Sequence, residues 1–397
     1  MEDKNTNTDL FKIFEFAQAA RVPIIEEQPG YNNRTPWVFY GIANQAPQEI
    51  IRLYNSSPTH RAACMMKWYN VRGESISLKD GDNSRLMMAN SIGDSIYDIW
   101  NKCALDFILY GCVSINVVFK RDRDLGFEMY AMDASKLRAE RNDLNDHVNN
   151  YFYSSDWSNV KKFPPRKLPA MNFNAEDPSQ VFYYTTHTPG AEYYSVPTWW
   201  GGATSISTEV EIYNWFHSNI VNGLQPSLFV SLNSGIPAPE QRSEIYETLT
   251  AKYGGSNNPG KLMLTFANSK EEAPEITTIG TNGTDTMFIE LSKKVQEAIL
   301  TSHQISSPEL LGIRTPSALG SPNHLESFDH FTHTVVAPIQ QELKSVFEKL
   351  LRLRDGKPAE IEIKQFEMVT IPDQAPVETV NVNKDVAVDE DKDETIV

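Results

Sequence analysis

Apolar residues recur at helical spacing in two long segments of this chain, Ala203–Asn222 and Asp285–His303. The first segment is bulky along most of its length, and at a rise of about 1.5 Å per residue it gives a helix of about 30 Å. The second carries one apolar stripe that includes Phe288 and Val295. A long helix that is apolar on more than one side must be covered on more than one side, either by its own chain or by adjacent subunits.

A small unit of mixed pattern separates these two helices. Leu228–Leu232 and Lys261–Phe266 are typical of strands, and Pro239–Tyr253 between them is typical of a helix. The pattern therefore predicts a compact αβ insert between the long helices.

The N-terminal half alternates between helical and strand patterns. Helices are predicted at Pro47–Tyr54, from the cap residue Ser57 to Gly73, and in an amphipathic segment that starts at Ser91. Residues 1–40 are predicted to be an arm that lies on a neighbour, and residues 141–180, rich in Asn, Asp, Ser and Pro, a long and poorly ordered connection. The predicted strands are Glu74–Lys79, Cys112–Lys120, Phe127–Met132, Asn149–Tyr153 and Val181–Thr185.

The C-terminal part begins with a loop, Ser306–Asn323, which holds three prolines and two glycines. Glu326–Leu353 is helical in pattern but contains Pro338, which removes one backbone hydrogen bond and should kink the helix. Glu360–Val369 is predicted to be a final strand. From Ile371 onward there are eight acids, two lysines and no aromatic residue, so we expect this tail to be disordered.

Composition narrows the class of protein without identifying it. The chain has 397 residues, of which 40% are hydrophobic and 11% aromatic, as is normal for a folded protein of two or three domains. We predict no membrane segment, because no apolar run approaches the roughly 18 residues that a spanning helix needs. Cys64, Cys103 and Cys112 show no CxxC spacing and are predicted to be reduced, packed thiols of a protein that folds in the cytoplasm.

Three features invite a chemical interpretation, and each has a structural alternative that we favour. Gly255–Leu262 has the GxxxxGK spacing of a phosphate-binding loop, but Leu262 replaces the hydroxyl residue that holds magnesium. A predicted helix also precedes this segment and a strand follows it, the reverse of the required order, so we interpret it as a helix-to-strand turn. Trp199 and Trp200 form either a sugar-binding platform or, as we favour, the anchor of the next helix in the core.

The third feature is a group of histidines, His324, His330 and His333. His330 and His333 could share a helix face and approach one metal ion, but no third ligand of matching spacing and no cysteine complete a site. We therefore expect solvated or interface histidines. On the residues alone we predict no catalytic, cofactor or metal site, and a metal-dependent soluble hydrolase stays open as the alternative.

Four short motifs occur in an order that resembles the core of the portal proteins of tailed bacteriophages. A Y-x-x-P motif at Tyr194–Pro197 precedes the first long helix, and N-G-x-x-P at Asn222–Pro226 follows it. P-x-L-L-G at Pro308–Gly312 lies beyond the second helix, and D-F-x-x-Y-G at Asp106–Gly111 lies in the N-terminal half. The motifs are individually short, but the resemblance spans about residues 45 to 370.

The resemblance implies an α+β portal fold with an α/β wing, a two-helix stem, a small αβ clip, a tunnel loop, a kinked helix and a minimal crown. The implied domains are residues 1–202 for the arm and wing, 203–223 for the first stem helix, 224–282 for the clip, 283–303 for the second stem helix, 304–325 for the tunnel loop, 326–370 for the kinked helix and the strand of the wing or crown, and 371–397 for the acidic tail.

The resemblance also implies a function without catalysis. Similar proteins form a ring of 12 at the unique capsid vertex of the virion, after assembly in the host cytoplasm, and DNA passes through the ring during packaging and ejection. The implied partners are double-stranded DNA bound without sequence specificity, the terminase large subunit, the head–tail adaptor, and the major capsid and scaffold proteins. The net charge of −16 fits such a conduit, because an acidic wall repels phosphate, but it fits an ordinary acidic protein equally well. A further alternative is another neck or virion structural protein.

Candidate site residues follow from this resemblance. Those expected to face DNA in the channel or tunnel loop are Lys293, Lys294, Ser306, Ser307 and Arg314. Those expected on the adaptor-facing side of the clip are Asn233, Ser234, Asn257 and Asn258. Those expected at the subunit interface are Trp215, Phe216 and Phe288. For the charged residues, a surface or intersubunit ion pair is the alternative to a DNA contact.

Overall fold

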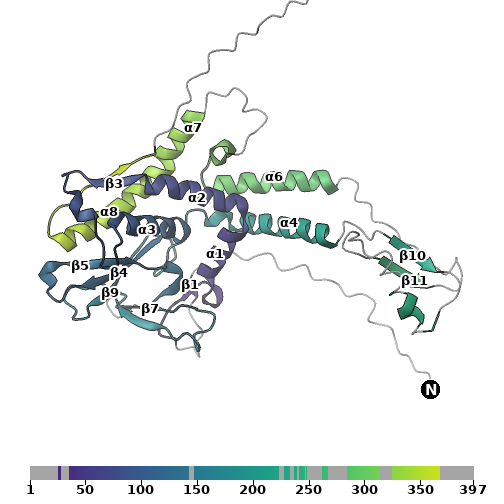
Figure 1. Cartoon of the computed structure of the whole chain (residues 1–397), viewed down its shortest axis with the longest axis horizontal. Helices are drawn as coiled ribbons and strands as arrows, with labels where there is room; N and C mark the ends of the chain where they lie inside the picture. Colours follow the sequence, from purple (N-terminus) through teal and green to yellow (C-terminus); the bar gives the residue numbers. More distant parts are fainter. Residues whose placement is uncertain are drawn as a thin grey trace, which may run out of the picture.

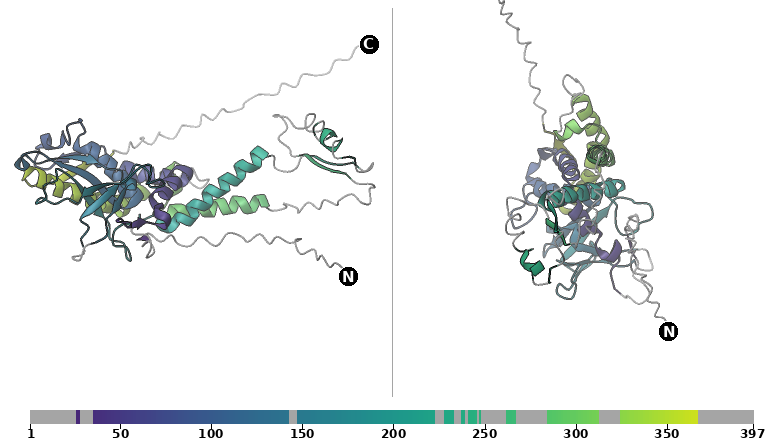
Figure 2. Two further views of the ribbon diagram at one scale, coloured as in Figure 1. Left: turned by 90° about the horizontal axis from the view of Figure 1, so that it is seen from below. Right: turned by 90° about the vertical axis from the view of Figure 1, so that its right-hand side faces the viewer.

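Two long helices, α4 (Ala203–Asn222) and α6 (Thr284–Ser302), extend side by side from a mixed helix–sheet body (Figures 1 and 2). Their bounds agree with the predicted helices to within one residue. At their far end β10 (Leu228–Leu232) pairs in parallel with β11 (Leu262–Phe266), and residues 241–245 between these strands are helical. The two predicted strands of the αβ insert are therefore confirmed. Because they pair in parallel, the chain between them must cross over, as a strand–helix–strand unit does.

The structure is a computed structural model. It describes residues 26–27, 35–142, 147–222, 228–232, 237–238, 241–245, 247, 262–266, 284–312 and 324–366. The term body denotes the described parts of residues 35–202 and 324–366.

The main core of the body lies between one antiparallel sheet and four helices. The sheet has the order β5-β4-β9, and its central strand β4 pairs with β9 along almost its whole length and with β5 along its second half. Its strands are β4 (Cys112–Phe119), β5 (Phe127–Ala131) and β9 (Ser179–Thr185). The helices are α1 (Ala46–Ser56), α2 (Pro58–Arg72), α3 (Ile96–Tyr110) and α8 (Ala337–Asp355). The predicted hairpin of β4 and β5 is confirmed.

Local capping sets the ends of α2 as the sequence predicts. The Ser57 hydroxyl accepts a hydrogen bond from the His60 backbone N–H, Pro58 occupies the first turn, and Gly73 ends the helix at a φ of 66°. The predicted start of the next helix at Ser91 is wrong. Ser95 and Asp98 form a capping box that starts α3 at Ile96, which leaves Ile92 74% exposed.

A second sheet occupies part of the region predicted to be a poorly ordered connection. It has the order β6-β7-β8, with β6 at Leu137–Ala139, β7 at Asn150–Tyr153 and β8 at Arg166–Pro169. Trp157 between β7 and β8 is buried, and its indole N–H donates to the Lys136 carbonyl at 2.9 Å. β7 confirms the strand predicted at Asn149–Tyr153. β8 and the buried Trp157 contradict the poorly ordered connection, because their order comes from tertiary contacts that composition does not reveal.

The motif around Tyr194 joins the second sheet to the N-terminal strands β1 (Glu26–Glu27) and β2 (Phe39–Tyr40). The Tyr194 ring stacks on Tyr40 at 4.1 Å, and its hydroxyl donates to the Val38 carbonyl at 2.7 Å. The Glu26 carboxylate accepts the backbone N–H groups of residues 192, 193 and 194. The Y-x-x-P segment is thus a fixed corner of the core.

The C-terminal helical run is interrupted just before Pro338, where the sequence predicts a kink. It comprises α7 (His324–Phe331), a π-helical turn at Thr332–Val336, and α8, which begins one residue before Pro338. Because proline lacks a backbone N–H and its ring displaces the carbonyl one turn earlier, the chain widens into a π-turn at this point. The run ends in β12 (Ile361–Lys364), which pairs with β3 (Ser75–Leu78) and is shorter than predicted. Residues 313–323 and the acidic tail lie outside the described residues.

Candidate functional site

The candidate site is the pair α4 and α6 together with its root, the place where both helices enter the body. Along the pair, Trp215 of α4 stacks on Phe288 of α6 with ring centroids 4.3 Å apart, and Phe216 packs edge-on to both. Trp215 nevertheless stays 43% exposed and Phe216 37% exposed. The three residues predicted at a subunit interface thus lie together across the two helices, with apolar surface left uncovered in the single chain.

At the root, a buried carboxylate joins α4 to the first turn of α2. Glu209 is 6% exposed; one of its oxygens accepts the Thr59 hydroxyl at 2.6 Å, and the other accepts the Ser57 hydroxyl. Ser57 is also the cap of α2, so the negative charge sits where the helix dipole and the free backbone N–H groups favour an anion. This arrangement fixes the long helix on the body.

A close approach fixes α6 in the same region. Gly202 ends the 3-10 turn η5 (Trp200–Gly202) and lies against Ser302 at the end of α6. A Cβ atom at Gly202 would meet the Ser302 Oγ at 2.3 Å and the Ser302 Cβ at 2.5 Å. Trp199, which is fully buried and donates its indole N–H to the Ile108 carbonyl at 3.0 Å, precedes this turn. Trp199 therefore anchors the helix entry in the core, as predicted.

The side chains of His60, Cys64 and His303 lie close together, and both histidines contact Trp199. The ligand atoms of His60, Cys64 and His303 lie within 4.8 Å of one another, and all three residues are buried. His60 Nδ1 lies 2.8 Å from His303 Nε2, so one ring donates a hydrogen bond to the other. No sequence pattern indicated this group, because His60 and His303 are 243 residues apart and neither belongs to a ligand motif.

This group does not form a preformed metal site. The Cys64 Sγ lies 3.7 Å from His60 Nδ1 and 3.9 Å from His60 Nε2. Such nearly equal distances place the sulfur over the face of the ring, away from the in-plane lone pair that would bind an ion. Lys67, buried on the same helix, adds positive charge that lowers the pKa of both histidines. The arrangement is that of a packed, hydrogen-bonded pair.

We expect the root of the helix pair to become less stable at low pH. Burial, assisted by Lys67, lowers the pKa of His60 to about 3 and holds that of His303 well below its usual value. The unfolded chain therefore binds more protons than the folded chain below about pH 6.5. Stability is fully present above that pH and is lost as the pH falls. Between pH 7 and pH 5, each imidazole should cost about 2 kcal/mol of unfolding free energy.

The measurement is the unfolding free energy at pH 7 and at pH 5. His303→Gln should reduce the change in unfolding free energy between the two pH values by about 2 kcal/mol, the contribution of one imidazole. His217→Gln, at an exposed position on α4, should leave that change as it is in the parent chain. Equal pH dependence in the parent chain and His303→Gln would contradict the assignment.

The remaining candidate residues fall into two groups. Lys293 and Lys294 are exposed on α6, and Ser306 is exposed just after it. The Ser307 hydroxyl accepts from the Glu309 backbone N–H and caps the 3-10 turn η6 (Pro308–Leu311), which ends at Gly312 in the left-handed conformation. The P-x-L-L-G motif is thus a capped turn at the exit of α6. The candidates outside the described residues are Asn233, Ser234, Asn257, Asn258 and Arg314.

Of the three histidines of the C-terminal run, His330 and His333 are exposed, as expected for solvated side chains. Within the described residues, no helix combines the length and apolar character that crossing a bilayer would require.

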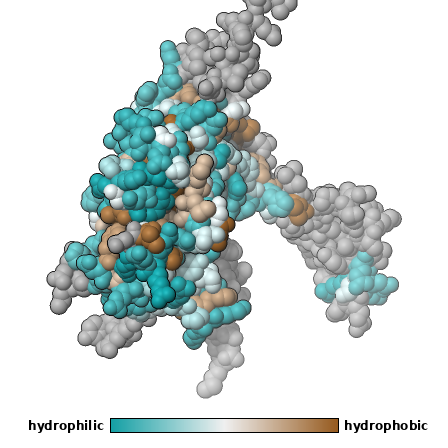
Figure 3. Space-filling model, turned by 60° about the vertical axis from the view of Figure 1, so that its left-hand side comes forward, coloured by the Kyte–Doolittle hydropathy of each residue, from teal (hydrophilic) through white to brown (hydrophobic). Residues whose placement is uncertain are grey.

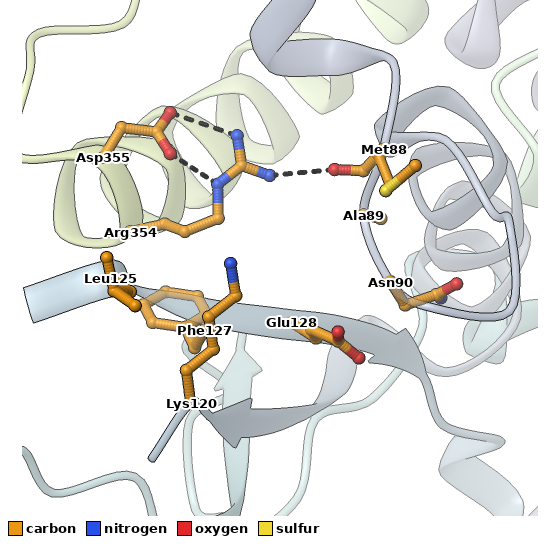
Figure 4. A pocket seen from close by; sticks show the side chains of 9 residues that line it. All are labelled: Met88, Ala89, Asn90, Lys120, Leu125, Phe127, Glu128, Arg354 and Asp355. Atoms are coloured by element: carbon orange, nitrogen blue, oxygen red, sulfur yellow. Dashed lines mark hydrogen bonds and ion pairs between the residues drawn. The ribbon is translucent and has the colours of Figure 1, made fainter. Parts of the chain in front are cut away.

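A hollow of about 270 Å³ lies beside β5 and the end of α8, on the side of the body away from the helix pair (Figures 1 and 4). Arg354 lies across it and bonds Asp355 at 2.6 Å and the Met88 carbonyl at 3.4 Å (Figure 4). It also donates to the Arg85 carbonyl at 2.7 Å. With a second bond to Asp355 at 3.1 Å, these contacts use four of the five N–H donors of the guanidinium. The nine lining residues include no serine, cysteine or histidine, so this hollow offers no serine–histidine or cysteine–histidine pair.

Exposed apolar side chains gather near this hollow. Figure 3, which brings this side of the molecule forward, shows apolar patches set among hydrophilic residues. The exposed side chains are Met87, Met88, Ile92 and Leu125.

Comparison with known proteins places the fold. No protein-family model matches the chain. A curated protein of Rickettsia felis, described as uncharacterized, is 27% identical over 137 residues, which is 34% of this chain and 34% of that protein, so the match spans about a third of the relative's length.

Solved structures match over most of the chain. A chain in the virion of a native gene transfer agent particle has a TM-score of 0.53 and 14% identity, covering 82% of this chain and 85% of that one. A chain in the neck of the native particle, computed with C12 symmetry, has a TM-score of 0.51 and 15% identity, covering 83% and 86%. An HK97-family phage portal protein from Corynebacterium diphtheriae has a TM-score of 0.44 and 11% identity, covering 79% and 94%. The chain shares the fold of the two chains of the gene transfer agent particle, and the predicted α+β class is confirmed.

Proposed function

We propose that this chain is the subunit of a portal ring, a structural protein at the unique vertex of a virus-like capsid through which DNA is packaged and ejected. In this proposal α4 and α6 form the stem, the β10–β11 unit forms the clip, and the body forms the wing. Twelve copies close the ring, which assembles in the host cytoplasm and becomes part of the virion.

The observation that carries the proposal is the uncovered aromatic surface on a rigidly rooted helix pair. Trp215 and Phe216 stay partly exposed on α4, although Glu209 and Gly202 hold the root of the pair in the body. A closed ring uses two different faces of each subunit, so a neighbouring copy would cover this surface. The shared fold with a chain of a neck computed with C12 symmetry supports twelve copies.

The charge of the chain suits a conduit. A net charge of −16 repels phosphate and opposes tight binding, so contacts with DNA should be few, made to the backbone and independent of sequence. Lys293 and Lys294 are exposed on α6 and are the proposed stem contacts. Ser306, Ser307 and Arg314 belong to the proposed tunnel loop.

The proposed partners follow from the same assignment. The terminase large subunit and the head–tail adaptor would dock at the clip, where the proposed contacts are Asn233, Ser234, Asn257 and Asn258, and the major capsid and scaffold proteins would surround the wing. A different structural protein of the neck is the second candidate, because the comparisons include neck structures in general. The residues at the His60–His303 pair and at the Arg354 hollow do not favour a metal-dependent hydrolase.

Negative-stain imaging with mass measurement tests the ring. Twelve copies of the 44.9-kDa chain should give a particle of about 540 kDa with a central hole. Solitary globules without a hole at micromolar concentration would overturn the proposal.

A pair of substitutions tests the proposed interface. Trp215→Ser with Phe288→Ser should weaken each subunit contact by about 2 kcal/mol and dissociate the ring, while circular dichroism shows retained helix content. His217→Ser, an exposed change on the same helix, should leave the ring intact. Rings of unchanged stability in the double variant would contradict the assigned interface.

A further inference from the structure

A run of basic residues without acids lies on the second sheet of an otherwise acidic chain. Residues 157–175 contain four basic side chains and no aspartate or glutamate, whereas the whole chain has a net charge of −16. All four are exposed and lie in the segment that leads into β8 or on β8 itself. They are Lys161, Lys162, Arg166 and Lys167.

Hydrogen bonds hold this basic segment in one conformation. The Phe163 backbone N–H donates to the Asn159 carbonyl at 2.9 Å, and the buried Ser154 hydroxyl donates to the Phe163 carbonyl at 2.9 Å. β8 then pairs with β7 over four residues. Because the backbone is already ordered, a partner would have little loop entropy to remove on binding.

The acids around the segment leave positive charge uncompensated. Lys167 pairs with Glu140 at 2.8 Å, and Lys162 lies near Asp156, whose pKa it helps to lower. Within the described residues, Lys161 and Arg166 take part in no ion pair. Two cations are therefore available at this surface, in addition to the partly shared Lys162.

Arg166 also borders a recess. It lines a hollow of about 420 Å³ together with Asp133 and Tyr153, and Asp133 is engaged by Lys136 at 3.3 Å. An acidic segment beside β8 would thus meet the Arg166 guanidinium at the edge of this hollow, whereas Lys167, the next residue of the strand, lies on the opposite face of the sheet.

We propose that this surface binds the acidic C-terminal segment of the same chain, residues 385–397. That segment contains six acids and one lysine, so its charge is complementary to the basic segment. It has no aromatic residue and too little apolar surface to bury on its own, so docking would depend on charge. Such docking takes place within a single chain and does not depend on the proposed ring.

The tether makes the chain's own tail the favoured occupant. The described residues end at Phe366, which leaves 31 residues that extend to at most about 100 Å and have a root-mean-square span of about 30 Å as a coil. A body of about 200 residues is roughly 45 Å across, so the tail can reach the surface. A tethered segment is present at an effective concentration of about 1 mM, whereas free DNA is repelled by the net charge.

Zero-length carbodiimide coupling of the full-length protein tests the contact, because it joins a lysine amine to a carboxylate only when the two touch. Mass spectrometry should find residues 385–397 joined to Lys161 or Lys162 at low salt, with strong loss of these links at about 1 M salt, where exposed charges are screened. In a mixture of isotope-labelled and unlabelled chains, the links should join segments of the same label. Links only between different labels, or only to other lysines such as Lys349, would overturn the proposal.

A variant with a neutralised tail keeps the protein folded and removes the electrostatic attraction. Neutralising the tail with Asp389→Asn, Glu390→Gln, Asp391→Asn, Asp393→Asn and Glu394→Gln should raise the acylation rates of Lys161 and Lys162 at least about threefold. Lys349, exposed on α8, should react at an unchanged rate. Unchanged rates at Lys161 and Lys162, or protection that appears only when a DNA duplex is added, would contradict tail docking.

Discussion

Glu209→Ala should lower the free energy of unfolding by about 3 kcal/mol and loosen the helix pair from the body. The substitution leaves the buried Ser57 and Thr59 hydroxyls without their acceptor and creates a cavity in a buried contact. It also removes the negative charge at the start of α2, where the helix dipole favours an anion. Urea unfolding monitored by circular dichroism measures the loss.

The same helix supplies the matched control. Glu211→Ala removes an exposed carboxylate two residues away and should change stability by no more than about 0.5 kcal/mol. Glu209→Gln retains one acceptor oxygen and should lose about half as much as the alanine variant. Equal stability of the Glu209 and Glu211 alanine variants would show that the buried carboxylate does not hold the root.

Gly202→Ala should cost about 2 to 4 kcal/mol, a large effect for a single methyl group. The new Cβ would lie 2.5 Å from the Ser302 Cβ, an atom fixed to the backbone of α6, so the helix itself must move. Thermal unfolding should show the loss, and hydrogen exchange should be faster at the last turn of α6.

The neighbouring glycine tests whether the crowding is specific. A Cβ at Gly201 meets nothing within 4 Å, so Gly201→Ala should be close to neutral. Ser302→Gly removes both atoms that the new methyl group would touch, and it should restore most of the stability lost in Gly202→Ala. Failure of this second substitution to rescue the first would exclude the contact as the cause.

Three of the four short motifs have a structural role in the described residues, whereas residues 223–226 of N-G-x-x-P lie outside them. The Y-x-x-P segment carries Tyr194, which stacks on Tyr40, and P-x-L-L-G forms a capped turn after α6. In D-F-x-x-Y-G, the Asp106 carboxylate accepts the Ala134 backbone N–H at 3.2 Å, and Gly111 ends α3 in the left-handed conformation. These are local requirements, so they leave a local trace in the sequence.

The candidate site was less visible in the sequence. Trp215, Phe216 and Phe288 could be selected because bulky residues on a long helix are conspicuous, and they do lie together. Glu209 was not selected because a carboxylate on a helix usually faces water, although it lies three residues from the buried Ile206 and Ile212. The histidines singled out in the C-terminal run are exposed in their described members, whereas the buried pair is His60 and His303.

The sequence by itself determined the two long helices, the αβ insert between them, the cap at Ser57 and the interruption near Pro338. Each of these depends on periodicity, on a capping side chain or on the missing N–H of proline, all of which act within a few residues. Tertiary structure alone decided β6, β8 and their pairing with the predicted strand β7, the late start of α3 and the root of the helix pair. There the decisive partners are far apart in the chain, 152 residues for Ser57 and Glu209, and only folding brings such groups within bonding distance.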